Sequence, residues 1–200
     1  MNKTNLKQEK WLHFDERLDV LCSLKMFNDL AHLSNSDRCH MKWSILSLHS
    51  ALQGMMAFHL SLGNDFFVMG KRDLAKWLEA HEAGTEYPVT RMDTFLNLYE
   101  KIQKHEIAQT RFNPTEQQTH SVKKIHEFRK EFTHFMPQHW SIEVSGLTDL
   151  FEDCLDIIKL LGDVNKPRWQ DQKQYQQFSR LIEKSYAQIK ASLRVSMQEP

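Results

Sequence analysis

The sequence predicts an all-α fold, an up-and-down bundle of about seven helices. The internal prolines and most glycines stand between segments of periodic hydrophobicity rather than inside them. Within the segments, apolar residues recur every three or four positions, which places them on one side of a helix, and the alternation typical of β-strands is almost absent. Because 200 residues suffice for one sizeable core, we expect a single domain over 1–200, with its core in about 6–161.

The boundaries of the predicted helices follow from capping and breaking residues. Asp37 can cap the start of the second helix, Gly63 ends it, and Pro167 separates the sixth helix from a polar seventh. The predicted helices cover about 6–33, 38–62, 71–82, 91–107, 114–136, 147–161 and 168–195.

The second predicted helix is apolar nearly all round, so it should be the buried centre of the bundle. It carries two polar side chains one turn apart, His49 and Gln53. A buried helix must pair such groups with a partner. They could therefore approach the fifth helix and support a site there, or form a satisfied pair within the core.

Composition and charge exclude several classes of protein. Lys plus Arg equals Asp plus Glu, at 26 each, so no overall field favours nonspecific coating of DNA. The three cysteines lack Cys-x-x-Cys spacing, which suggests neither a disulfide framework nor a thiolate zinc site. No apolar run reaches the length of a membrane span, and the polar start lacks an apolar signal region. We therefore expect a cytoplasmic protein without membrane contact.

The fifth predicted helix contains the densest group of ionisable residues. Its apolar side carries Ile125, Phe128, Phe132 and Phe135. A second row contains His126, Lys130 and His134 at i, i+4 spacing, and Arg129 lies between the two rows. Arg129 and His134 are about 140° apart around a regular helix. They can reach one groove only if a neighbouring helix or subunit completes it.

Few familiar catalytic motifs are present. The chain lacks a Gly-rich phosphate loop, His-Glu-x-x-His and Gly-x-Ser-x-Gly. Glu131 and His134 have the Glu-x-x-His spacing of carboxylate di-metal bundles, but a second copy is missing, so we expect no metal and no cofactor. Arg129, Glu131 and His134 could also be ordinary surface pairs of small energetic value. Their apolar setting favours a function, because a partly desolvated Arg129 calls for an anionic partner.

The segment from Arg129 to His134 resembles the Arg-x(4–6)-His motif of the HEPN superfamily, which lies on a late helix of an all-α bundle. The following residues 135–143 and the earlier residues 48–54 are similar to those of a group of uncharacterised bacterial proteins associated with this superfamily. The helical context of the resemblance covers about 6–161.

The resemblance implies a homodimer in which two motif helices meet, and in many members a metal-independent endoribonuclease of a toxin–antitoxin, phage-defence or RNA-processing system. Arg129 would bind and stabilise the scissile phosphate. His134 would act as general acid or base while the RNA 2′-hydroxyl attacks. Lys130, Glu131 and Thr133 would support this site. The implied partners are RNA or a nucleotide, a second copy of the chain, and an antitoxin or other protein.

One residue departs from the family pattern. The position after the motif arginine is usually a small polar residue, and here it is Lys130. A lysine can contact phosphate, but it cannot accept a hydrogen bond that orients His134. The alternative is therefore a catalytically inactive dimeric module that binds RNA, a nucleotide or a protein partner.

Overall fold

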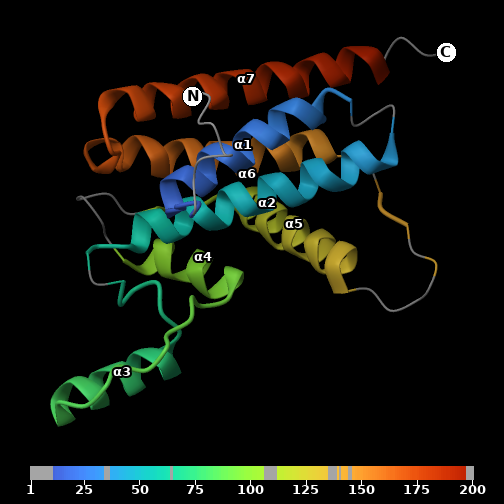
Figure 1. The fold of residues 1–200 in the computed structure, drawn as a ribbon. Helices are drawn as coiled ribbons and strands as arrows, with labels where there is room; N and C mark the ends of the chain where they lie inside the picture. The colour runs from blue at the N-terminus through green and yellow to red at the C-terminus, as the bar shows by residue number, and fades with distance from the viewer. Residues whose placement is uncertain are drawn as a thin grey trace.

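The computed structural model describes residues 11–33, 37–63, 65–105, 112–134, 139, 141–143 and 146–196, with side chains as far as residue 191. Within these residues the chain forms seven α-helices and one short 3₁₀ helix (Figure 1). They are α1 (Glu16–Ala31), α2 (Arg38–Leu60), α3 (Lys71–Ala83), α4 (Phe95–Lys104), α5 (Glu116–His134), α6 (Leu147–Val164), η1 (Lys166–Arg168) and α7 (Gln172–Ser196). The described residues pair as β-structure only at a single bridge between Met69 and Met92. The all-α prediction is confirmed.

Capping side chains explain where the predicted helix starts were right and wrong. Asp37 caps α2 as expected, since its Oδ1 accepts a hydrogen bond from the backbone N–H of Cys39 at 2.8 Å. The start of the first helix near residue 6 was wrong, because Asp15 is extended and caps α1 through the Leu18 N–H. Similarly, Thr94 caps α4, so this helix begins at Phe95 rather than near 91. Residues 6–10 and the expected capping residues 34–36 lie outside the described part.

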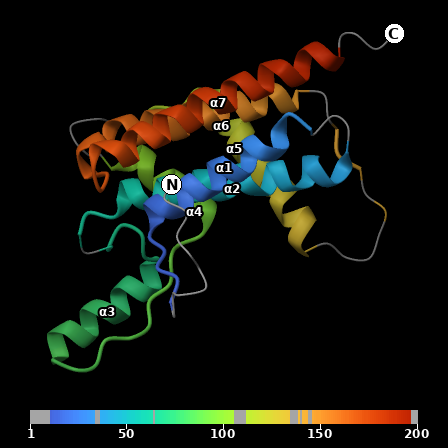
Figure 2. The same cartoon turned by 45° about the horizontal axis from the view of Figure 1, so that its top comes forward.

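Helix α2 lies at the centre of the bundle, as its sequence predicted. It packs against α1, α4, α5 and α6. Helices α1 and α2 run in opposite directions, as do α6 and α7, while α4 and α5 cover the side of α2 that faces away from α7 (Figures 1 and 2). None of the helices in the described residues has both the length and the apolar character needed to cross a membrane.

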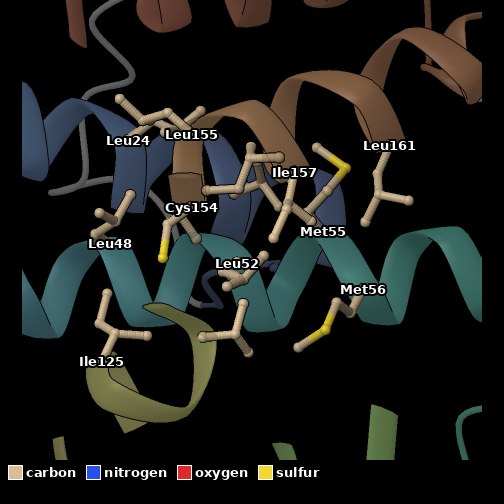
Figure 3. Close-up of a cluster of buried hydrophobic side chains, with 14 of the residues drawn as sticks. Leu24, Leu48, Leu52, Met55, Met56, Ile125, Cys154, Leu155, Ile157 and Leu161 are labelled. Atoms are coloured by element: carbon tan, nitrogen blue, oxygen red, sulfur yellow. The ribbon is translucent and has the colours of Figure 1, made fainter. Parts of the chain in front are cut away.

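The core forms where α2 meets its neighbours. Figure 3 shows Leu48, Leu52 and Met55 of α2 beside Cys154 and Leu155 of α6, and all five side chains are buried. Full burial of one such aliphatic side chain stabilises a fold by roughly 1.5–3 kcal/mol. Because α1 and α5 also contribute to this cluster, one core holds the elements that carry the motif.

The polar last helix also contributes to the core. Phe178, Ile182 and Ile189 of α7 are buried, although most of its other described side chains face solvent. α7 approaches α6 closely at Gly162, where an added Cβ would lie 2.3 Å from the Phe178 ring. The core therefore continues beyond residue 161, the end of the region in which we expected it.

Helix α3 differs from the others because none of its residues is buried and it projects from the bundle (Figures 1 and 2). The chain returns along it through residues 84–93. Trp77 stacks on Tyr87 with ring centroids 4.8 Å apart, and Phe66 packs edge-on against Trp77. We call α3 together with residues 84–93 the α3 arm.

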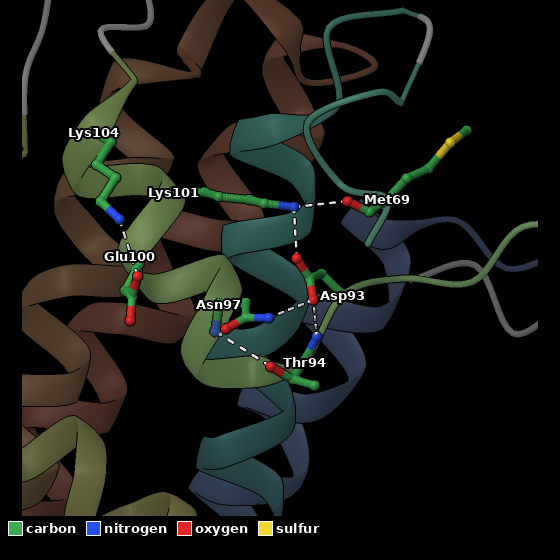
Figure 4. Close-up of polar contacts among 7 residues, drawn as sticks. All are labelled: Met69, Asp93, Thr94, Asn97, Glu100, Lys101 and Lys104. Atoms are coloured by element: carbon green, nitrogen blue, oxygen red, sulfur yellow. Dashed lines mark hydrogen bonds and ion pairs between the residues drawn. The ribbon is translucent and has the colours of Figure 1, made fainter. Parts of the chain in front are cut away.

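Polar contacts join the arm to α4 (Figure 4). The Lys101 ammonium lies 2.7 Å from a carboxylate oxygen of Asp93 and donates to the Met69 carbonyl at 2.7 Å. Asn97 donates to the other carboxylate oxygen of Asp93. Desolvation alone would raise the pKa of Asp93, but hydrogen bonds from Lys101, Asn97 and the Thr94 N–H lower it. The base of the arm is therefore held by a charged network.

All three cysteines are free thiols in different environments. Cys39 in the first turn of α2 is exposed, Cys22 is half-buried and Cys154 is fully buried. Burial raises the pKa of the Cys22 thiol and, much further, that of Cys154.

Candidate functional site

Helix α5 is positioned by a cap at its start and by apolar contacts along one side. Thr115 and Gln118 form a reciprocal capping box, with each side chain accepting a hydrogen bond from the other's backbone N–H. Ile125 and Phe128 are buried in the core. This arrangement leaves the far end of the helix exposed.

The helix ends at His134, where the motif residues reach the surface. Lys130, Glu131, Thr133 and His134 are all exposed. The Thr133 hydroxyl donates to the Arg129 carbonyl at 2.8 Å, a contact within the helix backbone. The predicted site therefore lies on an accessible stretch of α5, and the expected last residues of the helix, 135 and 136, lie outside the described residues.

A pair of imidazoles, the buried His49 and the half-buried His126, joins this helix to the centre of the bundle. His49 Nε2 of α2 lies 3.1 Å from His126 Nδ1 of α5. The Phe95 ring stacks on both imidazoles, with centroids 4.1 Å from that of His49 and 4.9 Å from that of His126. The expectation that His49 would need a polar partner is thus met by a residue of the motif helix.

Burial and nearby cations keep this pair uncharged. Desolvation lowers the pKa of His49 from 6.5 to about 3, with smaller contributions from His126 and Arg129. Desolvation also lowers the pKa of His126, assisted by the charges of Lys130 and Arg129. Near pH 7 one neutral ring therefore donates to the other, and the positive charge of Arg129 lies beside them.

Arg129 is half-buried, as its apolar neighbours indicated. Among the described residues, no carboxylate lies within ion-pair distance of its guanidinium. Gln53, by contrast, lines a cavity of about 510 Å³ with Asp15 and Asp19 of α1. The structure therefore brings His49 to the motif helix and places Gln53 at a different surface.

Two residues that the sequence did not single out, Lys42 and Trp43, lie at the end of α2 that meets α5. The Lys42 Nζ lies 5.8 Å from the Phe132 ring centroid and 5.4 Å from that of Trp43. Trp43 is 53% exposed. Along α5, Arg129 lies between His126 and Phe132, two residues that contact α2.

We call this region the α2–α5 surface. It comprises Lys42 and Trp43 in the second turn of α2 and Arg129, Lys130, Phe132 and His134 in the last two turns of α5, with Arg129 and His134 about 140° apart around the helix. Cations beside exposed aromatic rings suit a phosphate backbone with unstacked bases. The contribution of α2 could be suspected only from Lys42-Trp43, which interrupts an otherwise apolar helix, because sequence spacing does not reveal which α2 residues meet α5.

Within the described part of the chain, no three His, Cys, Asp or Glu side chains gather closely enough to hold a metal ion. Comparisons with protein-family models, curated proteins and solved structures found no match. The chemistry of the α2–α5 surface is therefore the basis on which a function can be assigned.

Proposed function

We propose that this chain is a HEPN-like protein that acts on RNA at the α2–α5 surface, as a metal-independent endoribonuclease of a toxin–antitoxin or phage-defence system. The observation that carries the proposal is the half-buried guanidinium of Arg129, which has no ion pair among the described residues, on the helix whose Phe132 contacts Lys42 of α2. An RNA phosphate supplies the anion that this guanidinium lacks. Stacking of a base on Trp43 positions the strand.

In the proposed reaction, Arg129 binds the scissile phosphate and stabilises the charge that develops on it. His134 takes the proton of the 2′-hydroxyl as general base, or protonates the leaving 5′-oxygen as general acid. Attack of the 2′-oxygen on phosphorus breaks the bond to the 5′-oxygen and leaves a 2′,3′-cyclic phosphate. Since His134 and Arg129 point about 140° apart on one helix, the two groups come from the motif helices of two copies of the chain.

The imidazole pair has a supporting role in this proposal. His49 and His126 are neutral near pH 7, so they add no charge that would compete with Arg129 for phosphate. Their contact holds α5 against α2 and thereby fixes the helix that carries Arg129. Lys130, which is exposed beside His126, supplies a further phosphate contact.

A second candidate is RNA binding without cleavage, and Lys130 favours it. A lysine at this position cannot accept a hydrogen bond from His134, so the imidazole would lack an orienting partner on its own helix. The binding surface would be unchanged. The two candidates therefore share a ligand and differ in turnover.

The test incubates the purified protein with total cellular RNA in EDTA, beside Arg129→Ala and His134→Ala, and identifies the 3′ ends of the fragments. The matched control is His120→Ala, which removes an exposed imidazole from the same helix about 21 Å from His134 along its axis. We expect both motif variants to lose roughly 10²- to 10⁴-fold in cleavage rate. The control should retain full activity.

Binding is measured separately with a 2′-O-methyl RNA, which lacks the attacking hydroxyl. Trp43→Ala should weaken this complex by about 1–3 kcal/mol through loss of stacking. Intact cellular RNA with tight, Trp43-dependent binding would select the second candidate. If the protein neither cleaves nor binds RNA, an RNA function for this surface is refuted.

A further inference from the structure

We propose that the α3 arm is a self-association device, through which two copies of this chain pair by laying the exposed faces of their α3 helices antiparallel. This contact is distinct from the α2–α5 surface, and it does not depend on RNA. Within the described residues, one side of α3 is left uncovered by the chain.

The uncovered side carries a stripe of four residues. Lys71, Ala75, Leu78 and Glu82 follow each other at spacings of four, three and four, which puts them on one side of the helix. All four are exposed, with Leu78 at 40%. The returning segment covers the other side of α3, where Trp77 stacks on Tyr87. The stripe therefore faces away from the arm's own chain.

The stripe is complementary to itself. Its midpoint lies between Ala75 and Leu78, so a two-fold axis through that point places Ala75 opposite Leu78 of the partner subunit. The same axis places Lys71 opposite Glu82 of the partner subunit. A small side chain then faces a large one and a cation faces an anion, twice each, as an isologous contact requires.

The charge order along α3 gives a second, independent argument. Lys71 at its N-terminus and Glu82 in its last turn stand at the ends that the helix dipole disfavours for their charges, whereas Asp73 and His81 stand at the favoured ends. No opposite charge lies within ion-pair distance of Lys71, Arg72 or Glu82 in the described residues. An antiparallel copy brings both an opposed dipole and the missing counter-charges.

The stripe is accessible to another molecule and is held in a fixed position. The arm projects from the bundle (Figures 1 and 2), so the body of the molecule does not cover it. The ring stack around Trp77 and the Lys101–Asp93 contact at the base hold it in place. A preorganised arm loses little conformational entropy on pairing.

Self-complementarity identifies the occupant as a second copy of this chain. A partner surface that carries charges of only one sign would attract one end of the stripe and repel the other, because Lys71 and Glu82 have opposite charges. A helix of 13 residues is only about 20 Å long, so the contact is smaller than a standard interface and the association should depend on concentration.

The test measures molar mass by sedimentation equilibrium over a range of protein concentrations, without RNA, for the full chain and for Lys71→Glu and Glu82→Lys. Each substitution places like charges opposite each other at both symmetric contacts. We expect roughly tenfold or greater weakening of self-association for each variant alone. Lys76→Glu makes the same charge change about 130° around the helix from the stripe, and it should leave the mass unchanged.

Mixing the two variants makes the test specific. A Lys71→Glu chain and a Glu82→Lys chain offer each other opposite charges at both contacts, so the mixture should reach a higher mass than either variant alone. A mixture with no higher mass than the single variants would overturn the proposal. Single variants that keep the wild-type mass would also overturn it, because self-association would then lie elsewhere, as at α5. A wild-type chain that is monomeric throughout would overturn the proposal and would count against the two-copy cleavage site too, whereas a loss of mass confined to the α3 variants concerns the arm alone.

Discussion

At the scale of single residues, the contact between His49 and His126 explains how a polar side chain is accommodated in the central helix α2. His49 is only 4% exposed, and it forms its polar contact with His126 of the motif helix. The same burial that makes this contact necessary lowers the pKa of His49 to about 3. The pair therefore links the stability of the fold to pH.

We predict that the free energy of unfolding falls as the pH drops below about 6.5. The unfolded chain takes up a proton on His49 near pH 6.5, whereas the folded chain does so only near pH 3. Proton binding thus favours the unfolded state between about pH 6.5 and pH 3. By pH 5, His49 alone should lower the free energy of unfolding by roughly 2 kcal/mol. His59, whose pKa burial lowers to about 4, acts in the same direction.

The measurement is urea denaturation at pH 7 and pH 5, for the wild type and for His49→Gln. The glutamine variant should lose about 2 kcal/mol less than the wild type between the two pH values. His13→Gln, at an exposed position, should behave as the wild type. Equal losses in all three proteins would mean that His49 is not the source of the pH dependence.

At the scale of elements, α6 and α7 approach each other closely at Gly162. A Cβ at Gly162 would lie 2.3 Å from the Phe178 ring, so these helices can approach only because that position has no side chain. In an exposed helix, replacing glycine with alanine stabilises by about 1 kcal/mol. At Gly162 the same replacement should instead destabilise the protein.

We predict that Gly162→Ala lowers the free energy of unfolding by about 1–3 kcal/mol through overpacking. The measurement is denaturant unfolding of Gly162→Ala, Phe178→Leu and the double variant. Because the smaller leucine makes room for the added methyl group, the double variant should be more stable than the sum of the two single changes predicts. Strict additivity would count against a steric conflict at this contact.

The sequence predicted these elements with uneven success, and the reasons are physical. The bounds of α2 and α3 and the start of α6 followed from the Asp37 cap, glycines and apolar runs, whereas α6 continues to Val164, beyond its predicted end at 161. The start of α1 was misplaced, because residues 11–15 have helix-compatible side chains and only the extended backbone at Asp15 ends the pattern. The buried stripe of α7 was underestimated since it is a few apolar residues within a polar helix, and only its packing on α6 shows that they belong to the core.

At the scale of the whole molecule, the balance of charge confines any attraction for RNA to a local surface. The chain carries 26 basic and 26 acidic residues. At the α2–α5 surface, however, three basic side chains, Lys42, Arg129 and Lys130, have no ion pair among the described residues. Binding should therefore involve few phosphates.

We predict a shallow salt dependence of binding to single-stranded 2′-O-methyl RNA. Three phosphate contacts give a slope of about −2 in a plot of log association constant against log salt concentration. Lys42→Ala should bring the slope closer to zero by about 0.7, and Lys104→Ala, which changes an exposed lysine on α4, should not alter it. A much steeper slope in the wild type would show that RNA covers a wider area than this surface.

How much of the candidate site could be predicted depends on whether its residues share one element. Arg129, Lys130 and His134 are near in sequence, so their helix could be recognised directly. His126 was visible as part of a row, but its contact with His49 across two helices was not. Lys42 and Trp43 gain their relevance only because the bundle lays the start of α2 beside the end of α5, a tertiary arrangement that no local pattern encodes.

Because the three thiols differ in exposure, Cys39 in the first turn of α2 can be labelled selectively. Cys39 is exposed, whereas burial raises the pKa of Cys22 and leaves Cys154 without solvent access, so a maleimide reagent should modify Cys39 first. That position is one helical turn from Trp43. A single fluorophore there would report the arrival of a ligand at the α2–α5 surface without any engineered cysteine.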